Sequence, residues 1–137
     1  MAVAEKQVMV IGIDDSEHST YALEWILDHF FVPVAPNCPF KLYIVHAKPT
    51  ASSAKISARV LEKAKEICTS KSVTDVVLEV GEGDARNVLC EAVEKHHASI
   101  LVVGSHGYGA IRRAFLGSVS DYCIHNASCS VVIVKKT

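Results

Sequence analysis

The residues best suited to chemistry lie in a glycine-rich stretch that starts at Gly104, runs through Gly107 and ends at Gly117 and Ser118. Gly104 and Gly107 allow the backbone to turn and to approach a ligand closely. Main-chain N–H groups in such a loop form a concavity that binds anions. Gly117 and Ser118 then open a helical pattern, whose N-terminus would add free N–H groups and a partial positive charge. Ser118 is the expected N-cap, and its hydroxyl can also donate to a phosphate oxygen. The stretch therefore predicts a phosphate site rather than a plain turn.

Two further polar residues are candidates for contact with a ligand. His106 lies inside the glycine-rich stretch, where a hydrogen bond to the ligand and a purely structural role are both open. Asp14 ends an apolar segment near the N-terminus. A carboxylate repels a triphosphate, so ribose hydroxyls or a metal ion suit Asp14 better, although it could also be a turn residue. Asp15 and Ser16 are expected to cap the first helix.

The elements that would position these residues follow from the apolar pattern. Continuous apolar segments of strand length occupy residues 8–13, 42–45, 100–103 and 131–134, as is typical of parallel strands buried on both faces. Residues 73–80 alternate only partly, which suits an outer strand. Helical patterns lie between these segments, so strands and helices alternate. The sequence therefore predicts an α/β fold, with a parallel sheet covered by helices on both faces and a ligand site at the carboxyl ends of its strands.

The spacing Gly104-x2-Gly107-x9-Gly117-Ser118 resembles the universal stress protein family, in particular its ATP-binding subgroup and its small single-domain plant members. Residues 11–19 are similar to the first strand and turn of that family, residues 44–47 to the end of its second strand, and residues 81–86 to the turn before its third helix. The resemblance covers nearly the whole chain. One departure is the short link of residues 49–54, where many plant relatives carry a longer segment beside the adenine.

The resemblance implies a single Rossmann-like domain over residues 1–137, with five parallel strands in the order 3-2-1-4-5. The strand order then reverses between the first and fourth strands, beside Asp14 and the glycine-rich loop. The implied ligand is ATP, or AMP or ADP, with Mg²⁺ accompanying a triphosphate through water and phosphate oxygens. By resemblance, the backbone of Ala47 meets the adenine edge and Ile13 forms an apolar wall. The residues expected to bind the nucleotide are Ile13, Asp14, Ala47, Val103, Gly104, His106, Gly107, Gly117, Ser118, Val119 and Ser120.

Composition narrows the class of protein and its partners. The 14 Lys and Arg residues are spread along the chain and the net charge is −1, so charge gives no support for nucleic-acid binding. No apolar run reaches the roughly 18 residues of a membrane helix, and the N-terminus lacks a signal-peptide pattern, so we expect a cytoplasmic protein without a membrane partner. The apolar last strand, Ser130–Val134, would be a sheet edge. Such an edge invites pairing, and family members commonly dimerise there, so we expect a homodimer.

Three functions remain open. The first is a nucleotide-dependent regulatory or interaction module of the stress response, as the resemblance implies. The second is a slow ATPase or nucleotide hydrolase, although the sequence offers no obvious general base near the γ-phosphate and no catalytic residue is assigned. The third is a redox-responsive, chaperone-like protein, suggested by the odd number of cysteines, 5, and by the apolar last strand. Reduced structural thiols are the simpler interpretation of these cysteines, because no pair has CxxC spacing.

Overall fold

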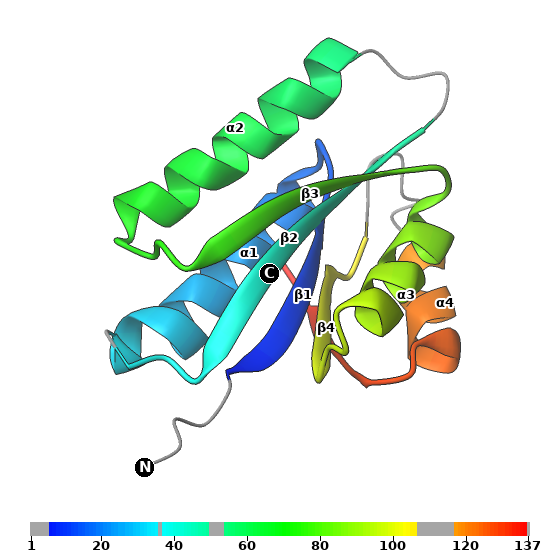
Figure 1. Cartoon of the computed structure of the whole chain (residues 1–137). Coiled ribbons are helices and arrows are strands. Elements are labelled where there is room, and N and C mark those ends of the chain that lie inside the picture. The colour runs from blue at the N-terminus through cyan, green and yellow to red at the C-terminus, as the bar shows by residue number, and fades with distance from the viewer. Residues whose placement is uncertain (1–5, 36, 50–53, 107–116, 137) are drawn as a thin grey trace.

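The computed structural model describes residues 6–35, 37–49, 54–106 and 117–136. Its centre is a parallel sheet of 5 strands in the order β3-β2-β1-β4-β5 (Figure 1). This order is the one expected from the sequence. The strands are β1 (Gln7–Ile13), β2 (Phe40–Lys48), β3 (Val76–Glu82), β4 (Ile100–Gly104) and β5 (Ser130–Val134).

Helices cover both faces of the sheet. The two helices α1 (Glu17–Ile26) and α2 (Ala54–Ser70) pack on one face, and α3 (Ala85–Lys95) and α4 (Ser118–Asn126) pack on the other (Figure 1). Helix α1 continues into a π-helical turn, Leu27–Phe31, and a short 3-10 turn, Val32–Val34.

The alternation of side chains along β1 explains why the strands are apolar throughout. Met9 and Ile11 face α1 and α2, whereas Val10 faces α3 and α4. All three are fully buried. A strand with helices on both sides has no polar face, because successive side chains point to opposite faces of the sheet.

The start of β3 differs from the sequence-based expectation. Residues 73–75 precede the strand, which begins at Val76. Ser72 takes a left-handed conformation with φ 59°, and the N–H of Val73 donates to Cys68 O at 2.9 Å. This bond and the one from the N–H of Ser72 to Thr69 O, at 3.0 Å, close the C-terminus of α2 in the manner of a Schellman motif. Val73 therefore completes the end of a helix instead of starting a strand.

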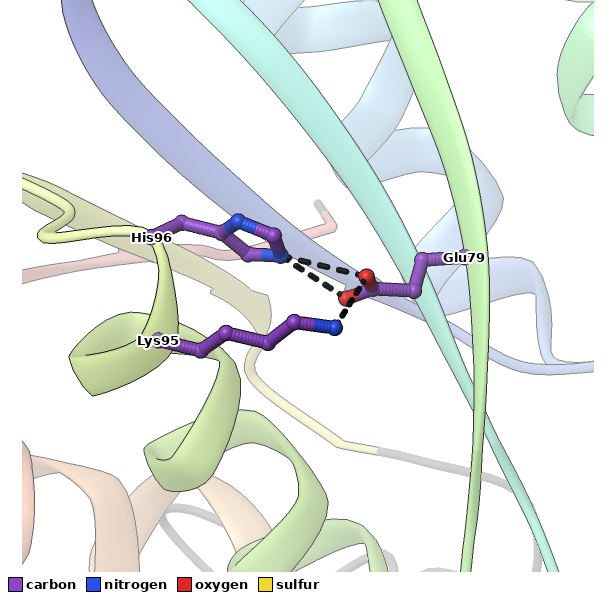
Figure 2. Close-up of polar contacts among 3 residues, drawn as sticks. All are labelled: Glu79, Lys95 and His96. Atoms are coloured by element: carbon purple, nitrogen blue, oxygen red, sulfur yellow. Dashed lines mark hydrogen bonds and ion pairs between the residues drawn. The ribbon is translucent and has the colours of Figure 1, made fainter.

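A polar cluster ties the C-terminal end of α3 to β3. The Glu79 carboxylate of β3 lies 3.1 Å from Lys95 Nζ and 3.0 Å from His96 Nε2 (Figure 2). Burial by itself would raise the pKa of Glu79, but the hydrogen bonds and charges of His96 and Lys95 outweigh it and lower that pKa below the ordinary value of 4.5. The ionised carboxylate is therefore favoured by folding.

Replacing Glu79 by glutamine is expected to lower the free energy of unfolding by about 1 kcal/mol at neutral pH. Since the pKa of Glu79 is lower in the folded than in the unfolded chain, its contribution is complete above pH 4.5 and is lost as the pH falls through the lowered pKa. Urea unfolding at neutral and acidic pH measures this. A deficit that persists unchanged once the wild-type carboxyl is protonated would contradict the assignment.

Candidate functional site

A cleft opens at the carboxyl ends of the strands, where the strand order reverses between β1 and β4. Its inner part has a volume of about 80 Å³, and its outer part about 790 Å³. The two parts share Asp14, Ala47, Ala85 and Val119, so they form one continuous cleft. The inner part is also lined by Gly12, Ile13, Ser19, Val45, Leu89, Val103, Gly104, His106, Gly117 and Ser120. The outer part is also lined by Asp15, His46, Pro49, Ile56, Gly83, Asp84, Arg86 and Ser118.

Every predicted contact residue that the structure describes lies in this cleft. Ser118 lines only the outer part, and the other nine line the inner part or both. Gly107 lies outside the described residues, as do Gly109, Arg112 and Arg113. The structure thus brings together residues from the ends of β1, β2 and β4 and from the start of α4.

Gly104 permits a close approach between two parts of the protein itself. A Cβ atom at this position would lie 2.9 Å from the carbonyl oxygen of His18 and 3.0 Å from its carbonyl carbon. Glycine at the end of β4 is therefore required by the backbone of α1. The sequence suggested an approach to a ligand, whereas the neighbour that excludes a side chain here is a helix.

The ends of the glycine-rich loop are joined by main-chain hydrogen bonds. The N–H of Ser105 donates to Val134 O at 3.0 Å, which extends the pairing of β4 with β5. The N–H of Gly117 then donates to Ser105 O at 2.7 Å. The chain that leaves the sheet at Ser105 thus returns to the same point at Gly117, and α4 starts beside the end of β4.

Helix α4 begins one residue earlier than expected. The N-cap is Gly117, with φ −69° and ψ 163°, and its carbonyl accepts from the N–H of Asp121 at 3.0 Å. Ser118 is the first helical residue and is exposed, so its prediction as N-cap is wrong. Glycine offers no side chain to bond the first-turn N–H groups, and these have no acceptor within the helix. The start of α4 therefore presents main-chain donors at the cleft, where Val119 and Ser120 lie.

Ser120 fixes α4 to the end of β4. Its hydroxyl is buried and donates to Gly104 O at 2.6 Å. Ser105 O lies farther away, at 3.3 Å. The hydroxyl hydrogen is thus used by the protein, and Ser120 can offer a ligand its main-chain N–H or an oxygen lone pair. Its predicted role in binding stays a prediction.

Replacing Ser120 by alanine is expected to lower the free energy of unfolding by about 1–3 kcal/mol, because the half-buried Gly104 carbonyl loses this donor. Ser118→Ala is the matched control on the same helix, where an exposed hydroxyl is removed at a cost within about 0.5 kcal/mol. Urea denaturation of both variants compares them directly. Equal midpoints would show that the bond between Ser120 and Gly104 contributes nothing to stability.

Asp14 organises the turn between β1 and α1 and also lines both parts of the cleft. Its Oδ1 accepts from the N–H of Ser16 at 2.8 Å and from the hydroxyls of Ser16 and Ser19. Ser16 is the N-cap of α1, and its Oγ accepts from the N–H of Ser19 at 3.2 Å. The capping prediction is confirmed for Ser16, whereas Asp15 does not serve as the N-cap. Asp14 therefore holds the turn and borders the cleft, and its contact with a ligand stays a prediction.

His106 borders the inner part of the cleft and packs against His18, a residue that the sequence did not single out. The two rings meet edge to face, with centroids 5.4 Å apart. Within the described residues, Nδ1 of each ring is buried and has no hydrogen-bond partner. A buried polar atom without a partner costs free energy, so a ligand group that bonds Nδ1 of His106 would recover that cost.

His46 joins the ends of two strands to α2 beside the outer part of the cleft. Its Nδ1 donates to Ile13 O at 2.9 Å, and its Nε2 accepts from Ser57 Oγ at 3.1 Å. Nδ1 must carry the proton in the neutral ring, because a carbonyl oxygen only accepts. The side chain is buried and also borders the outer part of the cleft.

Four of the five cysteines lie in surroundings that disfavour the thiolate. Burial raises the pKa of the Cys68 thiol to about 11 and that of Cys123 to about 12. Burial also raises the pKa of Cys90 and Cys129. The thiolate is the reactive form, so these four residues are expected to be inert. For these four residues, reduced structural thiols are therefore the simpler interpretation.

The described residues contain neither a cluster of metal-ligating side chains nor a helix suited to a membrane. No group of three or more His, Cys, Asp or Glu side chains in residues 6–35, 37–49, 54–106 and 117–136 lies close enough to hold a metal ion. In the same ranges, no helix has both the length and the apolar composition needed to cross a bilayer.

A parallel sheet with a ligand cleft at its switch point is the architecture of Rossmann-like α/β proteins. The model of the universal stress protein family matches residues 6–135, and the chain belongs to this family. The resemblance noted in the sequence is thereby confirmed.

Curated relatives in Arabidopsis thaliana support this membership. The universal stress protein PHOS32 is 31% identical over 91% of this chain and 63% of its own length. The universal stress protein PHOS34 is 28% identical over 91% of this chain and 60% of its own length. The chain therefore spans less than two thirds of these relatives.

Solved structures share the fold. A universal stress protein in complex with cAMP is 27% identical, with a TM-score of 0.72 over 96% of this chain and 98% of that one. A universal stress protein family protein from Arabidopsis thaliana with AMP bound has a TM-score of 0.73 at 21% identity, over 96% of this chain and 92% of that one. At the latter identity the likeness concerns the fold alone.

Proposed function

We propose that the chain binds an adenine nucleotide, ATP by preference, in the cleft between β1 and β4. In this role it would act as a nucleotide-dependent regulatory or interaction module of the stress response. The observation that carries the proposal is the convergence of Asp14, Ala47, His106 and Gly117 on one cleft at the switch point of the sheet. Family membership and the neighbours bound to cAMP and AMP support the same ligand class.

The chemistry of the cleft suits a nucleotide. Ile13, Val45, Ala47 and Leu89 give the inner part an apolar wall, as a base requires. Main-chain donors at the start of α4 suit phosphate. The inner part, at about 80 Å³, has room for only a few waters of roughly 30 Å³ each. A nucleotide would therefore extend through both parts of the cleft.

Mg²⁺ and the homodimer belong to this proposal. Asp14, Asp15 and Asp84 line the cleft, and a triphosphate would meet less repulsion if it entered as a magnesium complex. Strand β5 is an edge of the sheet, and Val131, Val132 and Ile133 are half-buried in the single chain. We infer pairing of two copies through Ser130–Val134 in the cytoplasm. A monomer mass by light scattering at micromolar concentration would argue against this dimer.

Mass spectrometry of small molecules released from freshly purified, denatured protein tests the proposal first. Co-purified ATP, ADP or AMP is the expected result. Isothermal titration with ATP, with and without Mg²⁺, then measures affinity, and GTP serves as the control for the base. Release of inorganic phosphate in the same samples reports any hydrolysis. A chain that retains no nucleotide and gives no heat with ATP under either condition does not have this function.

A further inference from the structure

One arginine borders the nucleotide cleft at the N-terminus of α3. Arg86 is the second residue of that helix and lines the outer part of the cleft together with Asp84 and Ser118. Within the described residues that line the two parts, Arg86 is the sole lysine or arginine, and three aspartates line the same cleft. Among these lining residues, the guanidinium of Arg86 is therefore the one permanently cationic group that an anion in the cleft can meet.

Helix stability does not explain an arginine at this position. The N-terminus of a helix carries a partial positive charge, so a cation in the first turn is unfavourable. Asp84, the N-cap, offsets this by holding the guanidinium, with Oδ2 2.9 Å from Nη2 and Oδ1 3.1 Å from Nε. The two side chains are each 44% exposed, so water screens the pair and its contribution to stability is small. The guanidinium can therefore change partner at little cost.

Tyr122 directs the guanidinium of Arg86 toward α4. Cζ of Arg86 lies 5.6 Å from the centre of the Tyr122 ring, within the range of a cation–π contact. Tyr122 follows Ser118 by four residues on α4, so the two share a helix face about one turn, 5.4 Å, apart. Ser118 lines the same outer part of the cleft as Arg86. The guanidinium thus lies between the start of α3 and Tyr122 of α4, and it borders the same part of the cleft as Ser118, near the start of α4 where phosphate is expected.

We propose that Arg86 is a specificity-determining residue, which exchanges its bonds to Asp84 for bonds to a phosphate group of the bound nucleotide. This inference rests on the proposed function. The planar guanidinium matches two phosphate oxygens as it matches a carboxylate. Asp84 keeps its role as N-cap after the exchange, because its Oδ1 accepts from the main-chain N–H of Arg86 at 2.9 Å. Arg86 would thus favour nucleotides over nucleosides.

Isothermal titration of the full chain with ATP, AMP and adenosine tests this role. Arg86→Gln is expected to weaken ATP binding by about tenfold or more, the loss of a charge-assisted bond, and to leave adenosine affinity within about twofold. Lys65→Gln is the matched control, since Lys65 is exposed and lines a separate groove between α2 and β3. It removes the same charge and should leave all three affinities unchanged.

The outcomes separate this inference from the proposed function. If the wild-type chain binds ATP but Arg86→Gln binds it as tightly as Lys65→Gln does, Arg86 has no role in phosphate binding and the proposed function stands. An equal loss for adenosine and ATP also overturns the inference, because Arg86 would then act on the shape of the cleft. A wild-type chain that binds none of the three ligands overturns both. If Arg86→Gln does not fold, Arg86→Lys is used instead, because it keeps the positive charge but lacks the planar guanidinium that bonds two oxygens. The comparison of ATP with adenosine is then the same.

Discussion

Gly104→Ala is expected to lower the free energy of unfolding by about 3 kcal/mol, because overpacking against a rigid neighbour costs this much. The added methyl group would meet the carbonyl group of His18 at 2.9–3.0 Å. Backbone cannot rotate away as a side chain does, so α1 must shift relative to β4. The shift would also disturb the turn at Asp14 and the packing of His18 on His106. Urea or thermal unfolding measures the loss.

Gly12→Ala is the matched control for this variant. Its added methyl group would lie 2.7 Å from Cδ1 of Leu89, the far end of a flexible side chain that can change rotamer. The expected loss is therefore smaller, about 1 kcal/mol. A Gly104→Ala chain that is as stable as Gly12→Ala would show that α1 yields easily, and the contact with His18 would then carry no constraint.

Val119→Trp is expected to weaken ATP binding by a factor on the order of 100, because the indole would occupy the space that the nucleotide needs. Val119 lies in the first turn of α4 and lines both the inner and the outer part of the cleft. It is only half-buried, so a larger side chain can be accommodated toward the cleft without breaking the core. Titration with ATP, together with a thermal melt of the free protein, separates lost binding from lost folding.

Ile124→Trp is the control for the same helix. Ile124 is 45% exposed and does not line either part of the cleft. The substitution introduces the same indole into α4 and should leave ATP affinity unchanged. If Val119→Trp binds ATP as the wild type does, the nucleotide does not occupy this cleft, whatever its true site.

Much of the fold is visible in the apolar pattern alone. The apolar runs at residues 8–13, 42–45, 100–103 and 131–134 each correspond to a strand of the sheet. Such runs are readable because a parallel strand buried on both faces has no polar positions. The outer strand is predicted less accurately, since Val73 caps the C-terminus of α2 and the strand begins only at Val76. The conformation of Val73 depends on the left-handed turn at Ser72, and the spacing of apolar residues does not predict such a turn.

The candidate site, like the fold, is predicted from the sequence in part. The sequence by itself determined that glycines follow one strand and open one helix, and that Asp14 ends another strand, because these are properties of short segments. It also predicted that the ends of these strands meet at one edge of a sheet. Its prediction that Ser118 is the N-cap failed by one residue, because Gly117 already has its carbonyl bonded to Asp121.

Only the tertiary structure decided which neighbours these residues face. Gly104 meets the backbone of His18, and Arg86 of α3 lies over Tyr122 of α4. Each contact joins segments that are distant along the chain, and each depends on how a helix docks on the sheet. The local sequence determines the conformational preferences of one segment. How a helix docks on the sheet depends on the shape and polarity of both surfaces together. The physical origin of this part of the site is therefore packing.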